Sequence, residues 1–195
     1  MGTDEVVPRQ VFAAYDRAAT AGHPAWFCPR CGAELALDPT GNRGECTRCE
    51  HVAYRSASPA VSIFVTDGER IVLCRRTPHA FRGGTWCLPC GFVDYDEDFL
   101  TAARREAREE TGLDVVVRSI VSVVSNFHLQ DLHTLVVVLE CDAIGGELRA
   151  GDDVDDVMWL APGDPFPPLA FEADEHVIRR WFVTGITGAP VEPND

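Results

Sequence analysis

The stretch from Gly91 to Leu113, GFVDYDEDFLTAARREAREETGL, constrains the fold of this chain more than any other part of the sequence. A strand-like segment, Trp86 to Cys90, leads into the glycine. No residue between Thr101 and Glu110 breaks a helix, and Gly112 stands where helices commonly end in a left-handed conformation. The sequence therefore predicts a strand, a glycine loop and a helix in that order.

Three carboxylates cluster on this predicted helix. Residues three and four apart share a helix face, so Glu106, Glu109 and Glu110 project together from about one turn. Like charges at this spacing repel, and a hard divalent cation with oxygen ligands relieves that repulsion. Mg²⁺ is the usual ion of this kind beside phosphate groups, although a solvated acidic face gives the same pattern.

Two CxxC pairs lie upstream, separated by fourteen residues. Their members are Cys28, Cys31, Cys46 and Cys49. Each pair places two thiolates on one side of a tight turn, and two such turns make a tetrahedral four-sulfur site for Zn²⁺. A closed site leaves no position for substrate, so we expect the zinc to be structural. Disulfides and unrelated thiols are the alternatives, and the lack of a secretion-signal pattern argues against disulfides.

The other cysteines are expected to be core residues. Cys87 and Cys90 form a third CxxC in the predicted buried strand, where residues three apart point to opposite faces. That arrangement disfavours a shared metal. Cys74 and Cys141 fall in apolar runs, and buried free cysteine usually packs as a small hydrophobic group.

The charge of the chain bears on its partners. The net charge is −14, and all seventeen cationic residues are arginine. Strong negative charge opposes non-specific binding to nucleic acids and to anionic membranes. No run of about eighteen apolar residues is present to span a bilayer. We therefore expect a cytoplasmic protein that acts on a small molecule, without nucleic-acid or membrane partners.

The constellation around the three glutamates resembles the Nudix box. That pattern is Gly, five residues, Glu, seven residues, Arg-Glu, an aliphatic-type residue, any residue, Glu-Glu, any residue, Gly and an aliphatic residue. Gly91, Glu97, the run from Arg105 to Glu110, Gly112 and Leu113 fill every fixed position. Asp96 is a departure, because many members carry glycine there. The resemblance implies an α/β fold, the Nudix α/β/α sandwich with a mixed sheet, preceded by a small zinc-ribbon domain.

On this basis we expect three parts of the chain: an N-terminal extension (1–25) with a helix around Val11 to Ala19, a zinc ribbon (26–57) and a Nudix hydrolase domain (58–195). Outside the box, the predicted elements of the Nudix domain are a hairpin of 60–65 and 71–76, strands at 115–125 and 134–142, and a helix at 173–182.

The resemblance also assigns roles to the box. Glu106 and Glu110 are implied as direct ligands of Mg²⁺ (or Mn²⁺), with Glu109 close behind. The backbone carbonyl before the box glycine, which here belongs to Cys90, is a further implied ligand. Arg105 and Glu97 would hold the loop against the helix rather than touch the reacting atoms.

The general base and the substrate contacts are less constrained. In Nudix enzymes the base is a box glutamate or an acidic residue of a distant loop. Asp155 aligns best among the acidic residues at 152–156, although a solvated acidic turn explains them equally well. Other candidates for substrate contact, which could equally be surface or core residues, are Phe81, Arg82, Phe127, His128 and His133.

Two Nudix groups carry a zinc ribbon. The NADH pyrophosphatase and NAD-decapping group has a Ser-Gln-Pro-Trp-Pro-Phe-Pro-type stretch after the box, and the region from Val123 to Gln130 does not match it. The other group resembles FAD and ADP-ribose pyrophosphatases and shares a segment like Pro165 to Phe171, PFPPLAF. We place the chain in this second group, whose members are often homodimers.

The implied activity is Mg²⁺-dependent hydrolysis of FAD, ADP-ribose or NADH into two phosphate monoesters. Three alternatives remain open from the sequence: a non-catalytic nucleotide-sensing domain, an enzyme that decaps NAD-capped RNA, and a hydrolase of a specialised biosynthetic nucleotide. The intact Arg-Glu-x-x-Glu-Glu run argues against a sensor, and the net negative charge argues against RNA.

Overall fold

A computed structural model describes residues 11–15, 26–129 and 132–191. The strands and helices, in chain order, are β1 (Val11–Tyr15), β2 (Leu35–Leu37), β3 (Arg43–Cys46), β4 (Val52–Tyr54), β5 (Ser58–Thr66), β6 (Ile71–Arg76), β7 (Trp86–Cys87), β8 (Cys90–Phe92), α1 (Phe99–Thr111), β9 (Leu113–Phe127), β10 (His133–Gly146), β11 (Val154–Leu160), α2 (Glu172–Thr184) and β12 (Ala189–Pro190). No helix among these residues is both long enough and apolar enough to cross a lipid bilayer.

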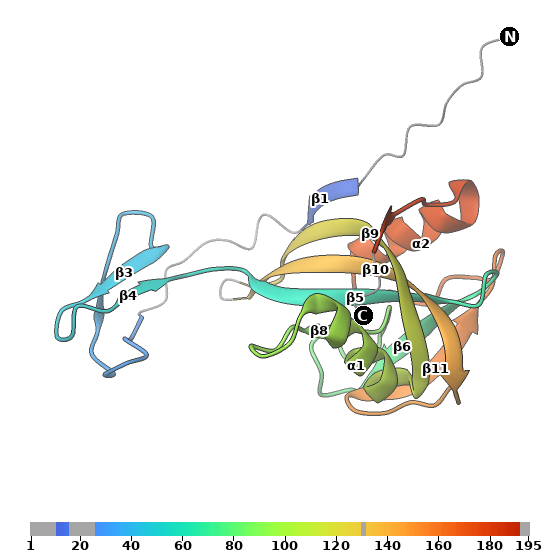
Figure 1. The fold of residues 1–195 in the computed structure, drawn as a ribbon, viewed down its shortest axis with the longest axis horizontal. Coiled ribbons are helices and arrows are strands. Elements are labelled where there is room, and N and C mark those ends of the chain that lie inside the picture. The colour runs from blue at the N-terminus through green and yellow to red at the C-terminus, as the bar shows by residue number, and fades with distance from the viewer. Residues whose placement is uncertain (1–10, 16–25, 130–131, 192–195) are drawn as a thin grey trace, which may run out of the picture.

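A mixed sheet forms the body of the described structure. Its order is β1-β9-β10-β5-β6-β11, with β12, β7 and β8 paired onto β9, β6 and β5. The pairs β1–β9 and β5–β10 are parallel, and the remaining pairs are antiparallel. Helix α1 covers one face of the sheet and α2 the other (Figure 1). This arrangement confirms the predicted α/β/α sandwich with a mixed sheet.

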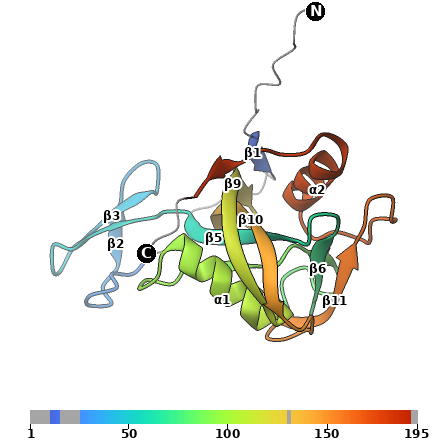
Figure 2. The ribbon, with the colours of Figure 1, turned by 45° about the vertical axis from the view of Figure 1, so that its right-hand side comes forward.

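A second, three-stranded sheet lies apart from the first. Its strands run antiparallel in the order β2-β3-β4. The chain continues from Tyr54, at the end of β4, into β5 at Ser58, and the small sheet stands beside the larger body (Figure 2). The four cysteines of the predicted zinc site lie at the end of β3 and in the turns beside this small sheet, and we refer to the sheet with these turns as the ribbon.

Helix α1 begins and ends at residues whose chemistry favours those boundaries. Asp98 caps its N-terminus, and its carboxylate accepts hydrogen bonds from Leu100 N at 2.9 Å and Thr101 N at 2.8 Å. Gly112 ends the helix with φ of 71°, the left-handed conformation that glycine adopts without strain. The helix predicted over 101–110 and its glycine end are therefore confirmed.

The core has one apolar layer on each face of the sheet. Strand β5 shows the reason, because alternate residues of a strand face opposite sides. Ile63 and Val65 pack toward Ala103 and the rest of the α1 layer, whereas Phe64 packs with Ile178 of α2. The two layers fix α1 and α2 to the sheet, and they thereby place the glutamates of the box and the first turn of α2.

The N-terminal extension differs from its prediction. Val11–Tyr15 is a strand, not part of a helix, and it pairs with β9 in parallel from Val11↔Ser122 to Tyr15↔Asn126. The remainder of the predicted helix, up to Ala19, lies outside the described residues. The helix prediction is wrong for the strand because a partner more than a hundred residues away supplies the backbone hydrogen bonds, and local periodicity does not show such a partner.

The predicted strand at 86–90 is also interrupted. Leu88 and Pro89 separate β7, which pairs with β6, from β8, which pairs with β5. As a result β5 and β6 pair only at Thr66↔Ile71, and the predicted hairpin opens beyond its turn. Cys87 and Cys90 do not point apart as predicted, because both Sγ atoms approach Arg76 Nη1, at 3.8 Å and 3.9 Å.

Candidate active site

The four cysteines predicted to hold zinc come together in the ribbon. Their sulfur atoms all lie within 4.8 Å of one another. The Cys28 and Cys49 sulfurs are 3.6 Å apart, and those of Cys31 and Cys46 are 3.5 Å apart. Gly32, at φ of 71°, closes the first turn by donating its N–H to Cys28 O at 2.8 Å. Four sulfurs in this arrangement fit one tetrahedral Zn²⁺ ion.

Backbone N–H groups prepare this cluster to ionise. A hydrogen bond from the Ala33 backbone lowers the pKa of Cys31 to about 6, and those from Arg48 and Cys49 lower the pKa of Cys46. For Cys49 the His51 backbone also lowers the pKa, but burial and the neighbouring thiols raise it to about 12. Crowded thiols cannot all ionise by themselves, whereas a divalent cation stabilises all four as thiolates.

Arg105 organises the loop between β8 and α1. Its guanidinium donates to Glu97 Oε1 at 2.5 Å, to Glu106 Oε1 at 2.7 Å and to Glu109 Oε2 at 3.1 Å. A further hydrogen bond at 3.1 Å reaches the carbonyl of Phe92 on β8. Arg105 and Glu97 thus join the loop to the helix, which is the role that the box implies for them.

Two of the three box glutamates are buried. Glu106 is 7% exposed and Glu110 is 1% exposed, whereas Glu109 lies at the surface. Glu110 Oε2 accepts a hydrogen bond from Cys90 N at 3.0 Å. Burial raises the pKa of Glu106, despite the nearby Arg105, and raises that of Glu110 well above its ordinary value. Arg105 alone cannot balance the charge of this carboxylate cluster, and the excess negative charge fits a hard divalent cation such as Mg²⁺.

Gly91 brings the loop against these carboxylates. A Cβ atom at this position would lie 2.0 Å from Glu106 Oε1, far inside van der Waals contact. The backbone of β8 therefore approaches the Glu106 carboxylate as closely as only glycine allows. The same strand carries the Cys90 carbonyl, so the implied backbone ligand and the glutamates lie side by side.

The acidic residues at 152–156, which include the predicted candidate base Asp155, lie at and just before the start of β11. Asp155 Oδ1 pairs with Arg75 Nε at 2.6 Å. The charges of Asp152 and Asp153 add to the effect of burial in raising the pKa of Glu106 and of Glu110 respectively. A register shift between Val154 and Asp156 in the β6–β11 pairing separates these two positions from Asp155.

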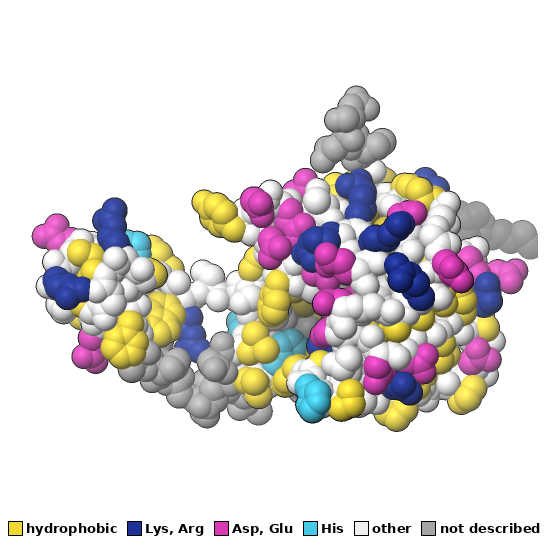
Figure 3. Space-filling model, turned by 90° about the horizontal axis from the view of Figure 1, so that it is seen from below, with side chains coloured by type: hydrophobic (Ala, Val, Ile, Leu, Met, Phe, Trp, Pro, Cys, Tyr) yellow, Lys and Arg dark blue, Asp and Glu magenta, His cyan; other side chains and the backbone are white. Residues whose placement is uncertain are grey.

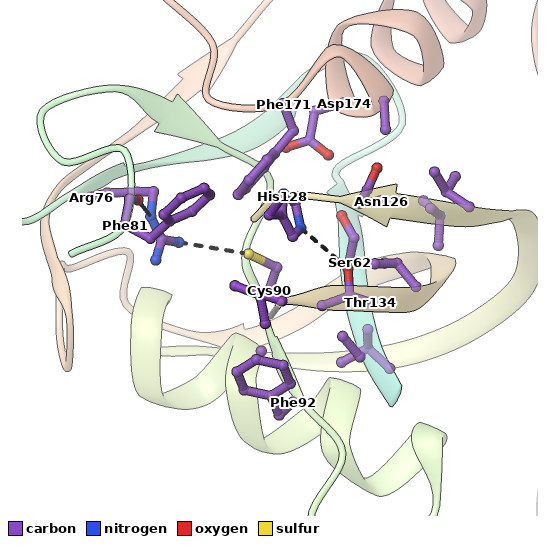
Figure 4. Close-up of a pocket in the computed structure, with 18 residues that line it drawn as sticks. Ser62, Arg76, Phe81, Cys90, Phe92, Asn126, His128, Thr134, Phe171 and Asp174 are labelled. Carbon is purple, nitrogen blue, oxygen red and sulfur yellow. Dashed lines mark hydrogen bonds between the residues drawn. The ribbon is translucent and has the colours of Figure 1, made fainter. Parts of the chain in front are cut away.

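A pocket of about 170 Å³ adjoins the box on the β8 side (Figure 4). Strands β5, β9 and β10 form an apolar floor, and Phe81, His128 and Phe171 form an aromatic wall. The ring of His128 lies 5.4 Å from each of the two phenylalanine rings. The other polar and cysteine side chains along the pocket are Ser62, Arg76, Cys90, Asn126, Thr134 and Asp174.

Of the residues predicted from the sequence as candidate substrate contacts, some line the pocket and the others lie outside it. Phe81 and His128 line it, whereas the Phe127 and His133 rings stack on each other, with centroids 3.9 Å apart. Arg82 lies over the Phe81 ring and donates to the carbonyl of Ala170.

The most buried charged residue of the pocket, Asp174, was missed from sequence. Its spacing from Val177 and Ile178 was a usable signal, because it places a carboxylate on the apolar face of α2. A carboxylate on that face is therefore directed toward the interior, where the pocket lies.

The comparisons with known proteins agree with this geometry. Residues 57–182 match the family model described as NUDIX domain. The chain therefore belongs to the NUDIX family, and with its complete box it is a Nudix hydrolase, which confirms the family, fold and enzyme predictions.

Named relatives fall into two groups. A protein named ADP-ribose pyrophosphatase from Methanocaldococcus jannaschii is 36% identical over 132 residues, which cover 66% of this chain and 76% of that protein. A protein named NAD-capped RNA hydrolase NudC from Pseudomonas aeruginosa is 27% identical over 144 residues, which cover 73% of this chain and 50% of that protein. The chain thus spans about half the length of the Pseudomonas relative.

Solved structures show the same fold. A NUDIX hydrolase from Nitrosomonas europaea superposes with a TM-score of 0.68 at 24% identity, covering 80% of this chain and 89% of its own. A MutT NUDIX hydrolase from Burkholderia pseudomallei gives 0.57 at 26% identity, covering 64% and 98%. These likenesses support the sandwich, and the site chemistry rests on the residues described above.

Proposed function

We propose that the protein hydrolyses the diphosphate bond of a nucleoside diphosphate linked to a second group, giving two phosphate monoesters. ADP-ribose, FAD and NADH are the candidate substrates. The observation that carries the proposal is the buried pair Glu106 and Glu110 beside the loop held by Arg105. The relative named ADP-ribose pyrophosphatase supports this substrate class.

The residues of the chain account for most of the required chemistry. Glu106, Glu109, Glu110 and the Cys90 carbonyl would hold Mg²⁺ (or Mn²⁺), which neutralises phosphate charge and acidifies a water molecule when bound. Arg105 keeps two of these carboxylates in place, and the Cys90 N–H orients the third. Arg76, at the boundary of pocket and acidic loop, adds positive charge where the diphosphate would lie.

The general base is proposed from the surrounding carboxylates. Nudix enzymes draw it from the box or from a distant acidic loop, and the geometry favours Asp152 and Asp153 of that loop. Asp155, the sequence candidate, forms an ion pair with Arg75, and Asp153 forms one with Arg76, so either pair would have to open before that aspartate could accept a proton. Three further expectations accompany this function: a structural Zn²⁺ in the ribbon, a cytoplasmic location and a homodimer.

A second candidate function is hydrolysis of NAD-capped RNA. It is favoured by the relatives named NudC and opposed by the net charge of −14, which repels an RNA chain. A nucleotide sensor has no use for the full set of box carboxylates, and a specialised nucleotide substrate would use the same site.

The test is a substrate panel with Mg²⁺, covering ADP-ribose, FAD, NADH, nucleoside-diphosphate sugars and NAD-capped RNA, with products separated by chromatography. We expect AMP and a partner monophosphate from at least one dinucleotide, and product formation about 10²- to 10³-fold slower from the Glu110→Gln protein. Turnover of capped RNA alone would favour the second function. If no compound is cleaved by folded, Mg²⁺-supplied protein, the proposed function is wrong.

A further inference from the structure

The pocket and the predicted metal site share one strand. Cys90 and Gly91 of β8 line the pocket, and the same two residues contact Glu110 and Glu106 through the hydrogen bond and the close approach described above. A ligand that fills the pocket therefore ends beside the glutamates. The deeper part of the pocket is placed to hold a portion of the substrate that does not react.

Asp174 reaches this deeper part from the first turn of α2 (Figure 4). The residue is 5% exposed, and its Oδ2 accepts a hydrogen bond from Leu88 N at 3.0 Å. Within the described part of the chain that is the only hydrogen bond to its carboxyl group. Its second oxygen is therefore available to a ligand in the pocket.

A structural role alone does not explain a carboxyl group at this position. An asparagine would accept the same hydrogen bond from Leu88 without bringing a charge into an apolar setting, which is costly. The cost is visible in the protein, because burial raises the pKa of Asp174 to about 7. Compared with asparagine, aspartate therefore offers the pocket a second acceptor oxygen where asparagine would offer an amide N–H₂ donor.

The walls of the pocket suit a flat ring. Phe81, His128 and Phe171 present aromatic surface on one side, and the apolar floor of the sheet lies opposite. The hydroxyl of Ser62 is buried in the floor and has no hydrogen-bond partner among the described residues. An apolar slot with a few directed polar groups is typical of sites that bind a heterocyclic ring.

We propose that this pocket binds the adenine ring of the substrate, and that Asp174 determines specificity by accepting a hydrogen bond from the exocyclic amino group. The inference rests on the proposed function for the substrate class, since ADP-ribose, FAD and NADH all carry adenine. Adenine is the common base that carries an amino group and no ring carbonyl. A ring carbonyl of another base would bring a second acceptor oxygen toward the Asp174 oxygen, which is unfavourable.

The test measures binding rather than turnover. AMP and purine riboside 5′-monophosphate differ only in the amino group, and calorimetry without Mg²⁺ compares their affinities for the full-length protein. We expect AMP to bind roughly tenfold or more tightly, as a hydrogen bond to a buried carboxyl group implies. In Asp174→Asn, Leu88 occupies the only amide oxygen, the N–H₂ meets the adenine amino group, and the preference is lost.

Glu172→Gln is the matched control, because it removes a carboxylate from the exposed side of the same helix turn and should keep the preference. Equal binding of both nucleotides by the wild-type protein, or no binding of either, overturns the inference without reference to any variant. If the protein binds AMP more tightly than purine riboside 5′-monophosphate but hydrolyses no dinucleotide, only the proposed function is contradicted. Hydrolysis of ADP-ribose without discrimination would contradict only the role of the pocket.

Discussion

The proposed zinc site of the ribbon and the proposed magnesium site of the Nudix body lie in opposite kinds of surroundings. Within the described residues the ribbon has a core of three buried residues, Cys28, Leu35 and Cys46, two of which are proposed zinc ligands. The Nudix body has two extensive apolar layers and buries the carboxyl groups of Glu106, Glu110 and Asp174. Acidic and basic side chains alternate over the α1 face of the body, and the ribbon lies apart from it (Figure 3).

The two parts differ in how much apolar surface they bury, and this difference bears on what a bound ion would do in each. A module as small as the ribbon cannot bury enough apolar surface to fold alone, so an ion has to replace the core. The Nudix body has two large apolar layers, and these hold Glu106 and Glu110 in surroundings that disfavour their charge and so favour binding of a cation. With the proposed ions, the ribbon would need its metal in order to fold, whereas the Nudix body would fold first and then bind its metal.

The largest effect that tests this comparison is loss of zinc. In Cys46→Ser we expect the ribbon to unfold, because structural zinc supplies on the order of 10 kcal/mol or more in small zinc modules. Backbone NMR signals of residues 26–54 should collapse toward random-coil positions while those of the Nudix body persist, and zinc content should fall to background. Cys141→Ala, a core cysteine outside the ribbon, should retain zinc. Wild-type protein without zinc and with an ordered ribbon would refute the comparison.

Next in size is the effect of Glu110→Gln on turnover. The change removes a buried proposed ligand, and the metal contribution lost corresponds to about a 10²- to 10³-fold drop in kcat with ADP-ribose and Mg²⁺. Thermal stability of the metal-free variant should equal or exceed that of the wild type, since a buried carboxyl group has been removed. A severe loss of stability would show that Glu110 supports the fold instead. Glu175→Gln, on the surface of α2, serves as the control.

A smaller effect concerns Asp174 and pH. Its folded pKa of about 7 lies above its ordinary value of 3.8, so its contribution to stability is fully present at low pH and is lost as pH rises through 7. Arg76 and the thiols of Cys87 and Cys90 interact electrostatically with Asp174, and His128 lines the same pocket. From pH 5 to pH 8 the wild type should lose roughly 2–3 kcal/mol through this group.

Denaturant unfolding of zinc-loaded wild type and Asp174→Asn at both pH values measures this loss. The stability of the variant relative to wild type should increase at the higher pH. Parallel behaviour of the two proteins would mean that the carboxyl group is not strained by burial.

The smallest effect separates the aspartates of the acidic loop. Asp153 lies near Glu110 and pairs with Arg76 at 3.3 Å, so Asp153→Asn should lower kcat roughly tenfold. Asp155→Asn removes only a surface ion pair with Arg75 and should change kcat less than about threefold. A larger loss for Asp155→Asn would restore that residue as the candidate base.

Features set by local spacing could be predicted from the sequence. The box helix, its glycine end and the clustering of the glutamates follow from helical periodicity over a few turns. The meeting of the four cysteines depends on two tight turns and one short sheet, each of which has a local signature. Because the connecting loops are short, the separation of these glutamates and cysteines along the sequence largely determines how they are placed in the folded protein.

Features set by distant partners could not be predicted in this way. Val11–Tyr15 is a strand because β9 lies beside it, and the direction of Asp155 depends on a register shift against β6. The pocket gathers residues from six strands and helices or the loops between them, so no single stretch of sequence indicates it. Asp174 is an intermediate case, since its position on the apolar face of α2 was visible but its neighbours were not.

The contacts of Arg105 have a consequence for how the protein is made in the cell. The guanidinium already neutralises part of the carboxylate cluster, so the newly synthesised Nudix body can mature before its catalytic ion arrives. In the ribbon, Arg48 lies beside the Cys31, Cys46 and Cys49 thiols, but its single positive charge cannot balance four thiolates. With the proposed ions, the supply of zinc during synthesis would govern the yield of complete molecules, whereas Mg²⁺ would bind to finished molecules and leave them reversibly.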